Sequence, residues 1–193
     1  VNGYSAELDK PSKPDLDRAK KLLAEAGYPS GFEFQLNCPN NRYVNDEKIC
    51  VAVVSMWAKI GLNVKLVAES MSTFIAKVQN FDTSAYMLGW GVATYDGQYS
   101  LQSLVRTRSG GPDGNFNFVK LSDAKVDQLT DAMKSETDVA ERNAMIRDAL
   151  VRTRDEFFFV PLHHQIRPWA MKQNVNTVHR SHDRPEARFT SLK

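Results

Sequence analysis

A glycine-flanked segment in the middle of the chain carries the residue types that line a small-molecule pocket. Trp90 lies between two glycines at the end of an apolar run, and Tyr95 and Asp96 follow it closely. In such pockets aromatic rings supply apolar contact area, and a charged group, here Asp96 or Arg42, orients the ligand. A structural interpretation is equally open from these residues: Trp90 belongs to the core, and Asp96 caps a helix that contains Leu101, Leu104 and Val105.

The four histidines do not form a metal-ligand pattern. His163 and His164 are neighbours, so on a strand their side chains would point to opposite faces, and His179 and His182 lie in a polar tail. Single histidines more often form hydrogen bonds or line a pocket. We therefore expect no metal ion and no other cofactor.

Motifs of nucleophilic and acid–base catalysis are missing from the sequence. No serine stands in a nucleophile elbow, and neither cysteine is accompanied by a recognisable histidine and asparagine arrangement. Asp123, Asp127 and Asp131 have the spacing of a solvent-facing helix stripe. Arg106 and Arg108 lie among glycines that match neither a phosphate loop nor a dinucleotide fingerprint. These observations predict a protein that is not an enzyme.

Two alternatives from other functional classes stay open at this point. One is an α/β enzyme that uses Asp96 and His164 as acid and base, which requires both side chains in one cleft with a strongly shifted pKa. The other is an interaction module that binds protein through an exposed face.

The composition is that of an ordinary globular domain. The chain has 193 residues, of which 42% are hydrophobic and 25% charged, enough to bury a core. The net charge of +2 does not favour nucleic acid or an anionic membrane as a partner. No run approaches the roughly 18 apolar residues of a membrane-spanning helix. The separation of Cys38 and Cys50 permits a disulfide if the chain turns back between them.

Hydrophobic periodicity predicts alternating helices and strands in the first half of the chain. We expect helices over residues 15–26, 45–60 and 70–78, and strands over residues 32–37, 63–67 and 85–91. Residues 38–43, which begin with Cys38 and Pro39, are expected to form a loop. The apolar stripe of the second helix consists of Ile49, Val53, Met56, Trp57 and Ile60.

The second half of the chain is predicted to contain more loop. A loop-rich region over residues 91–117 precedes helices that begin near Ser122 and Asp138. The apolar residues 157–162 are predicted to form a buried strand, and residues 175–178 have strand character.

This order of elements predicts the α/β class, with a mixed, largely parallel sheet flanked by helices. Ligands of such sheets bind beyond the carboxyl ends of the strands. The loops after Leu36, Trp90 and Leu162 are therefore the candidate ligand-binding loops.

Five segments together resemble the extracellular solute-binding proteins of family 5, the oligopeptide, dipeptide and nickel receptors of ABC importers. The segments run in order through nearly the whole chain: AKKLLAEAGYP with Gly31 and Phe32 at residues 19–32, MWAKIGLNV at 56–64, LGW at 88–90, Asn117 leading to VDQL at 126–129, and VPL at 160–162.

The resemblance implies the C-terminal lobe of a periplasmic binding protein type II fold. It implies a linker or lead-in over residues 1–14, the α/β lobe over 15–165, and a tail over 166–193 that returns to a lobe missing from this chain. The whole receptor would close two lobes on a peptide or peptide-like solute, outside the cytoplasm, and deliver the solute to a membrane permease. The surface left by the missing lobe would favour self-association.

The resemblance also implies a set of ligand-binding residues: Arg42, Trp90, Ala93, Tyr95, Asp96 and Asn117. Peptide-binding members carry a carboxylate for the ligand amine at the position of Ala93. Recognition of a free peptide amine by this chain would therefore require Asp96 to take over that role. Arg42 lies near an arginine that binds the ligand carboxylate in dipeptide-binding members. The oxidising compartment implied by the family favours a disulfide between Cys38 and Cys50.

Overall fold

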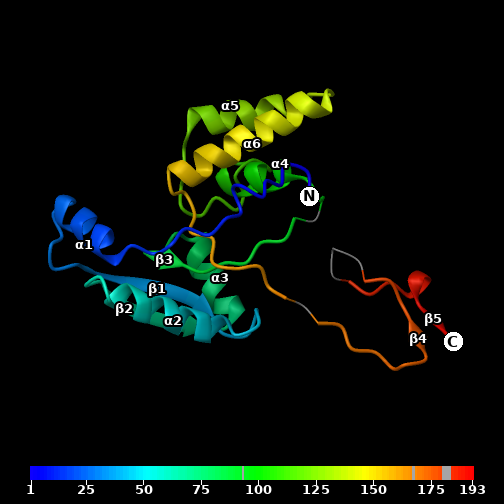
Figure 1. Cartoon of the computed structure of the whole chain (residues 1–193), viewed down its shortest axis with the longest axis horizontal. Helices are drawn as coiled ribbons and strands as arrows, with labels where there is room; N and C mark the ends of the chain where they lie inside the picture. The colour runs from blue at the N-terminus through cyan, green and yellow to red at the C-terminus, as the bar shows by residue number, and fades with distance from the viewer. Residues whose placement is uncertain (93, 167, 180–183) are drawn as a thin grey trace. The chain divides into compact units, whose positions relative to one another are not determined.

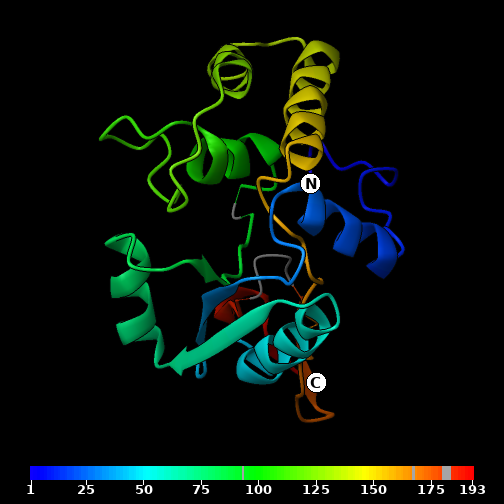
Figure 2. The ribbon, with the colours of Figure 1, turned by 90° about the vertical axis from the view of Figure 1, so that its left-hand side faces the viewer.

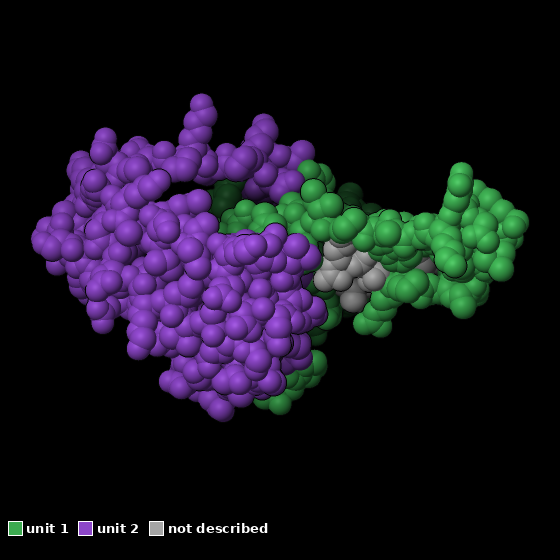
Figure 3. Space-filling model, turned by 90° about the horizontal axis from the view of Figure 1, so that it is seen from below, with its two compact units in different colours: residues 1–4, 91–114, 122–193 green, residues 5–90, 115–121 purple. Residues whose placement is uncertain are grey.

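The computed structural model describes residues 1–92, 94–166, 168–179 and 184–193. The chain forms two compact units, coloured separately in Figure 3. Unit 1 consists of residues 1–4, 91–114 and 122–193, and unit 2 of residues 5–90 and 115–121. The residues expected to form one lobe, 15–165, are therefore shared between two units.

Unit 2 is built on a three-stranded parallel sheet, as the α/β prediction requires. The strands β1 (Glu33–Pro39), β2 (Asn63–Glu69) and β3 (Ala85–Tyr86) have the order β2-β1-β3. The helices α1 (Leu16–Glu25), α2 (Asp46–Ala58) and α3 (Met71–Gln79) alternate with them along the chain (Figure 1). The predicted helices and the first two strands of this half are confirmed.

The two faces of the sheet are covered by different helices, because successive strand residues point to opposite sides. On one face Leu36 and Val64 pack against Cys50, Val53, Val54 and Trp57 of α2. On the other face Tyr86 contacts Phe74 of α3, with ring centroids 6.5 Å apart. Figure 2 shows α2 and α3 on opposite sides of the sheet. Met56, predicted within the buried stripe of α2, is instead 60% exposed.

The prediction of a loop over residues 38–43 was wrong for its first two residues, because β1 continues through Pro39, and it is confirmed for residues 40–43. Cys38 pairs with Ala68 of β2, and Pro39 with Glu69. Pro39 has no N–H to donate, but that position faces the β3 side, where pairing ends at Asn37 and Tyr86. The missing donor therefore interrupts no ladder hydrogen bond.

The apolar run at residues 85–91 forms much less strand than predicted. Only Ala85 and Tyr86 pair with β1, and β3 lies at an edge of the three-stranded sheet rather than inside it. After Tyr86 the chain leaves the sheet plane with a single further bond, from the Met87 N–H to the Asn37 carbonyl. Glycines at 89 and 91 weaken strand formation further along the run.

Unit 1 is mainly helical. It contains α4 (Gly97–Ser100), the π-helix η1 (Leu101–Val105), α5 (Ala124–Ala132) and α6 (Val139–Asp155). Asp96, Asp123 and Asp138 cap α4, α5 and α6 through side-chain oxygens. The helix starts predicted near Ser122 and Asp138 are confirmed. The helices enclose the buried residues Leu101, Val105, Val126, Met133, Ile146 and Ala149.

Residues 157–162, predicted to form a buried strand, are not a strand in the described structure. They leave α6 in irregular conformation, with Phe157 82% and Val160 72% exposed. A strand requires a neighbour for its backbone hydrogen bonds, and no described residue pairs with this segment. Further along, β4 (Val175–Asn176) confirms part of the strand character at 175–178 and pairs antiparallel with β5 (Ser191–Leu192), beside the 3-10 turn η2 (Ala187–Phe189).

The first residues of the chain are more than a lead-in. The Asn2 N–H donates to the Tyr95 carbonyl at 2.8 Å, and the Gly97 N–H donates to the Asn2 carbonyl at 2.9 Å. Gly3 lies so close to Ile146 that a Cβ there would overlap the isoleucine side chain. Residues 1–4 therefore form part of unit 1.

Among the helices of the described ranges, none has the length and apolar character needed to cross a membrane.

Candidate functional site

Three loops meet at the carboxyl edge of the unit 2 sheet, where the sequence predicts ligand binding. The loop after β1, residues 40–45, is tied to the end of β2 because the Asn40 N–H donates to the Glu69 carbonyl at 2.9 Å. It is tied to α3 because the Asn41 side-chain oxygen accepts from the Met71 N–H at 2.8 Å. It also reaches the loop after β3, where the Tyr43 hydroxyl donates to the Gly89 carbonyl at 3.4 Å.

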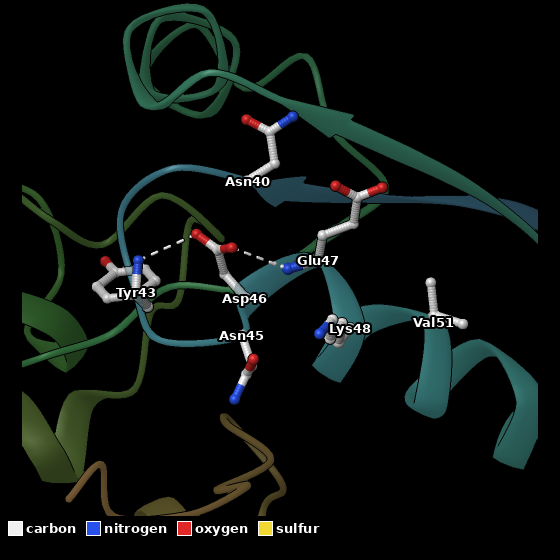
Figure 4. Close-up of a pocket in the computed structure, with 7 residues that line it drawn as sticks. All are labelled: Asn40, Tyr43, Asn45, Asp46, Glu47, Lys48 and Val51. Carbon is white, nitrogen blue, oxygen red and sulfur yellow. Dashed lines mark hydrogen bonds between the residues drawn. The ribbon is translucent and has the colours of Figure 1, made fainter.

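Asp46 organises the loop after β1 from within. Its buried carboxylate accepts from the backbone N–H groups of Arg42 at 2.9 Å, Tyr43 at 3.0 Å and Glu47 at 2.9 Å. Figure 4 shows two of these bonds. Burial acts to raise the pKa of Asp46, but the backbone hydrogen bonds outweigh it and the pKa is lowered. The carboxylate is therefore ionised at neutral pH.

A disulfide closes the same loop. Cys38 at the end of β1 and Cys50 in α2 are bonded, with Cα atoms 6.7 Å apart, and both residues are buried. The spacing of the cysteines alone left this bond open, since nothing local shows that the chain turns back within twelve residues, and the family resemblance favoured it. Together with Asp46, the disulfide holds both ends of the segment that carries Arg42 and Tyr43.

Arg42 presents an exposed guanidinium at this edge. Its Cζ lies 5.2 Å from the centroid of the Tyr43 ring, the geometry of a cation–π contact. Within the part of the chain that the structure describes, no carboxylate forms an ion pair with Arg42. The cation is thus available for an anionic group from outside the unit.

A hollow of about 610 Å³ lies beside the loop after β1. It is lined by Asn40, Tyr43, Asn45, Asp46, Glu47, Lys48 and Val51, drawn in Figure 4. Most of these side chains are polar, and Glu47 and Lys48 carry opposite charges. The hollow suits a small polar group rather than an apolar ligand.

Two other predicted site residues also belong to unit 2. The half-buried Trp90 packs edge to face on Phe116, with ring centroids 5.1 Å apart, and Phe116 packs on Phe118 in the same way at 5.8 Å. Asn117 is fully buried, and its side chain both donates to the Leu121 carbonyl and accepts from the Leu121 N–H at 2.9 Å. These contacts give Asn117 a role in holding the segment on which Trp90 packs.

Tyr95 and Asp96 lie in unit 1, and Ala93 lies outside the described residues. Asp96 forms a two-pronged ion pair with Arg142, at 2.6 and 3.0 Å, and also accepts from the Gln98 N–H at 2.9 Å. Burial acts to raise the pKa of Asp96, but the hydrogen bonds from Arg142 and Gln98 outweigh it, so the pKa is lowered. Asp96 has the helix-capping role that the sequence held open, together with an ion-pair partner 46 residues away.

The acidic stripe of α5 is not simply solvent-facing, as its spacing suggested. Arg106 pairs with Asp127 at 2.9 Å and with Asp131 at 3.0 Å, and Arg152 pairs with Asp123 at 3.0 Å. The cations come from segments distant in sequence, so spacing alone could not reveal them.

Among the described residues, no group of three or more histidine, cysteine or acidic side chains is placed to hold a metal ion.

The comparisons with known proteins identify the family. The family model described as bacterial extracellular solute-binding proteins, family 5 middle, matches residues 1–112, more than half of the chain. The chain belongs to this family. The resemblance stated from the sequence is therefore confirmed.

Curated relatives and solved structures agree with this membership. The chain is 26% identical over 170 residues to the heme-binding protein A of Haemophilus influenzae, and the alignment covers 84% of the chain. It is 28% identical over 159 residues to the periplasmic oligopeptide-binding protein OppA of Escherichia coli, and that alignment covers 79% of the chain. The structure of HbpA2 from Haemophilus parasuis aligns over 99% of the chain with a TM-score of 0.82 and 25% identity. The fold is thus that of the periplasmic binding protein type II class.

The 193-residue chain covers only part of the length of these relatives. It spans 30% of the heme-binding protein A, 28% of OppA and 38% of the HbpA2 chain. The DppA protein of Helicobacter pylori, in complex with the peptide STSA, aligns over 80% of this chain and 29% of its own, with a TM-score of 0.69 and 28% identity.

Tyr43 and Asp46 are the residues at this edge that sequence reasoning missed as part of the site. Asp46 was recognised only as a start of α2, and Tyr43 only as part of a loop. The available signal was weak: a carboxylate four residues after an arginine, in a proline- and asparagine-rich loop. The bond from Tyr43 to Gly89 depends on the fold, whereas the Asp46 carboxylate bonds to residues within four positions of it.

Proposed function

We propose that this family 5 chain works as part of the solute-binding component of an ABC importer, outside the cytoplasm. The whole receptor would bind a peptide or peptide-like solute and present it to the membrane permease. The single observation that carries the proposal is family membership, because it covers residues 1–112 and therefore both β1 and β2 with their loops.

The site at the carboxyl edge of the unit 2 sheet is the candidate contribution of this chain to solute binding. Arg42 would bind a carboxylate or another anionic group of the solute through charge-assisted hydrogen bonds. Trp90 would supply apolar contact area beside it. The solute contacts that the family resemblance implies for Ala93, Tyr95, Asp96 and Asn117 remain proposals.

A peptide-like solute is favoured by the relatives, although they are named for different ligands. The names include oligopeptide-, di/tripeptide-, glutathione-, heme- and deoxycholate-binding proteins. Each of these solutes carries a carboxylate. An exposed arginine that has no acidic partner among the described residues is compatible with all of them.

A role without catalysis is supported by the state of Asp96. The enzyme alternative uses Asp96 and His164 as acid and base, and it needs a carboxyl group whose pKa lies near the working pH. The hydrogen bonds from Arg142 instead lower the pKa of Asp96 and hold it ionised. An inert, ion-paired carboxylate fits a binding protein better than an acid–base catalyst.

Nuclear magnetic resonance titration of the chain with a mixture of di- and tripeptides tests this function. We expect weak binding, with a Kd of about 1 mM or above, because the chain would supply only part of the pocket. Shifts should concentrate at Arg42, Tyr43, Gly89 and Trp90. The absence of shifts at these residues, or micromolar affinity, would contradict the proposed shared site. Mass spectrometry of solute released from a denatured full-length receptor would then name the ligand.

A further inference from the structure

We propose that Tyr43 and Asp46 are positioning residues that hold Arg42 in its binding arrangement before any solute arrives, and that Gly89 provides the seat for the Tyr43 ring. The inference rests on the proposed function, since it assigns how that site is preorganised. It concerns only unit 2, where all four residues lie.

Asp46 fixes the backbone at Arg42 itself. One carboxylate oxygen accepts from the N–H groups of both Arg42 and Tyr43, and the other accepts from Glu47. The residue is 4% exposed, so its oxygens have little access to replacement water bonds. Because a buried carboxylate left without hydrogen-bond donors is costly, the loop has a strong preference for this one backbone conformation.

Tyr43 and Gly89 lock the loop after β1 to the loop after β3. A Cβ at Gly89 would lie 2.7 Å from the Tyr43 ring, closer than carbon atoms pack, so the ring occupies the space of a side chain. The Tyr43 hydroxyl donates to the Gly89 carbonyl at 3.4 Å. Glycine at 89 is therefore required by the close approach of the ring, since its φ angle is not in the left-handed region.

The seated ring in turn orients the arginine. The guanidinium of Arg42 lies over the Tyr43 ring, which restricts a side chain that otherwise loses rotamer freedom on binding. The disulfide between Cys38 and Cys50 anchors both ends of the loop. Restricting Arg42 in advance lowers the entropic cost of binding, so affinity for an anionic group should depend on residues that do not touch it.

The experiment uses two matched probes, trialanine and its C-terminal amide, which differ in the carboxylate. Titrations of the 193-residue chain followed by resonance shifts should show tighter binding of the acid. Arg42→Gln should abolish the difference between the probes. Gly89→Ala, which displaces the ring, and Asp46→Asn, which replaces an acceptor by a donor, should each weaken trialanine binding about 3- to 10-fold and leave the amide unchanged.

A control substitution in the same loop separates the loss of Arg42 positioning from a general structural effect of adding a side chain there. A Cβ at Gly91 meets nothing within 4 Å, so Gly91→Ala should bind both probes as the unsubstituted chain does. Tyr43→Phe keeps the ring and loses only the long hydroxyl bond, so it should retain most of the discrimination. Thermal melts should show that each variant is folded at the titration temperature.

The outcomes distinguish this inference from the proposed function. If the unsubstituted chain discriminates between the probes and Gly89→Ala and Asp46→Asn discriminate equally well, the positioning roles are wrong and the proposed site stands. If the unsubstituted chain binds trialanine and its amide equally well, or if Arg42→Gln still binds trialanine more tightly, Arg42 does not bind the carboxylate. Both the proposed site and this inference are then overturned. Faster exchange of the Arg42 and Tyr43 amide hydrogens in Asp46→Asn is expected as well, and unchanged exchange would count against Asp46.

Discussion

The two units of the chain are stabilised by different kinds of interaction. Unit 2 has a parallel sheet, a buried disulfide and a run of aromatic contacts from Tyr28 through Phe32 and Phe34 to Trp57. Unit 1 has helices joined by ion pairs between segments far apart in the chain. The comparison indicates that each unit should respond to a different chemical challenge: reductant for unit 2, and acid or salt for unit 1.

The ion pairs of unit 1 form a connected set around the loop before α5. Lys134 pairs with Asp113 at 3.0 Å and with Asp131 at 2.9 Å, and Asp131 also pairs with Arg106. Asp113 accepts from the Gln102 side chain at 2.8 Å. A network of this kind orders a loop of polar and glycine residues that has few apolar side chains to bury.

Removing the disulfide should have the largest effect and should be confined to unit 2. The double substitution Cys38→Ala and Cys50→Ala is expected to lower the unfolding free energy of unit 2 by about 3 kcal/mol, because the open chain gains loop entropy. Hydrogen exchange in denaturant should show faster opening of β1 and unchanged protection of α6. Equal destabilisation of α6 would show that the two units unfold together.

Removing the Asp96 carboxylate should be the next largest effect, confined to unit 1. Asp96→Ala leaves the largely buried Arg142 guanidinium without its partner and removes the α4 cap, at a cost of about 2 kcal/mol. The matched control is Asp148→Ala, whose partner Arg147 is 61% exposed, and it should change stability little. Chemical denaturation followed at α6 measures both. A null effect of Asp96→Ala would contradict the role of this pair.

Acid should weaken unit 1 through its network of ion-paired carboxylates. Side-chain hydrogen bonds from Gln102 and Lys134 lower the pKa of Asp113, and those from Arg106 and Lys134 lower the pKa of Asp131. A lowered folded-state pKa gives stability that is present above the unfolded value of about 4 and is lost as pH falls through the folded value. We expect a loss of about 1 kcal/mol below pH 4, since partial exposure screens these pairs.

The salt dependence of stability provides a second test that ion pairs stabilise unit 1. Raising the ionic strength at neutral pH should reduce the stability of unit 1 more than that of unit 2, because exposed ion pairs are screened and a disulfide is not. Unit 2 should lose the smaller contribution of its Lys77–Glu69 pair. Thermal melts followed by amide resonances of α5 and β1 make the comparison. Parallel losses in both units would argue against the ion-pair network as the source.

Alkali should affect unit 2 through Tyr86. Burial raises the pKa of Tyr86 to about 12. Because the phenol ionises nearer 10 in the unfolded chain, stability is complete below pH 10 and is lost as pH rises toward 12. Ultraviolet titration should detect a phenol that ionises near this value, and it should be absent in Tyr86→Phe. Titration of every tyrosine near 10 would contradict the burial of this ring.

Features that depend on neighbouring residues were predictable from the sequence. Asp123 and Asp138 lie directly before helical periodicity, and both cap helices in the structure. The alternating pattern after Gly31 correctly indicated β1, and its end was missed because a proline inside a strand is tolerated only where no donor is needed. Such a position becomes visible only once the extent of β3 is known.

Features that depend on distant segments were not predictable. The sequence suggested a ligand role for Asp96, but its partner Arg142 lies 46 residues away. The predicted strand at 157–162 has the right composition, yet strand formation depends on a pairing partner that composition cannot supply. The ligand site at the sheet edge stays a prediction. Tyr43 was missed because its contact with Gly89 arises from tertiary structure. Asp46, whose hydrogen bonds are local, was missed because a carboxylate at a helix start is usually interpreted as a cap.

The interleaving of the two units has a consequence for synthesis on the ribosome. Phe118 is buried with Phe74 and Val78 in one cluster, so the face of α3 is incomplete until residue 118 has emerged from the exit tunnel. Residues 1–4 in turn cannot pack in unit 1 until Ile146, which Gly3 contacts, is present more than 140 residues later in the chain. Neither unit can therefore complete its packing before the chain reaches these later residues, Phe118 for unit 2 and Ile146 for unit 1.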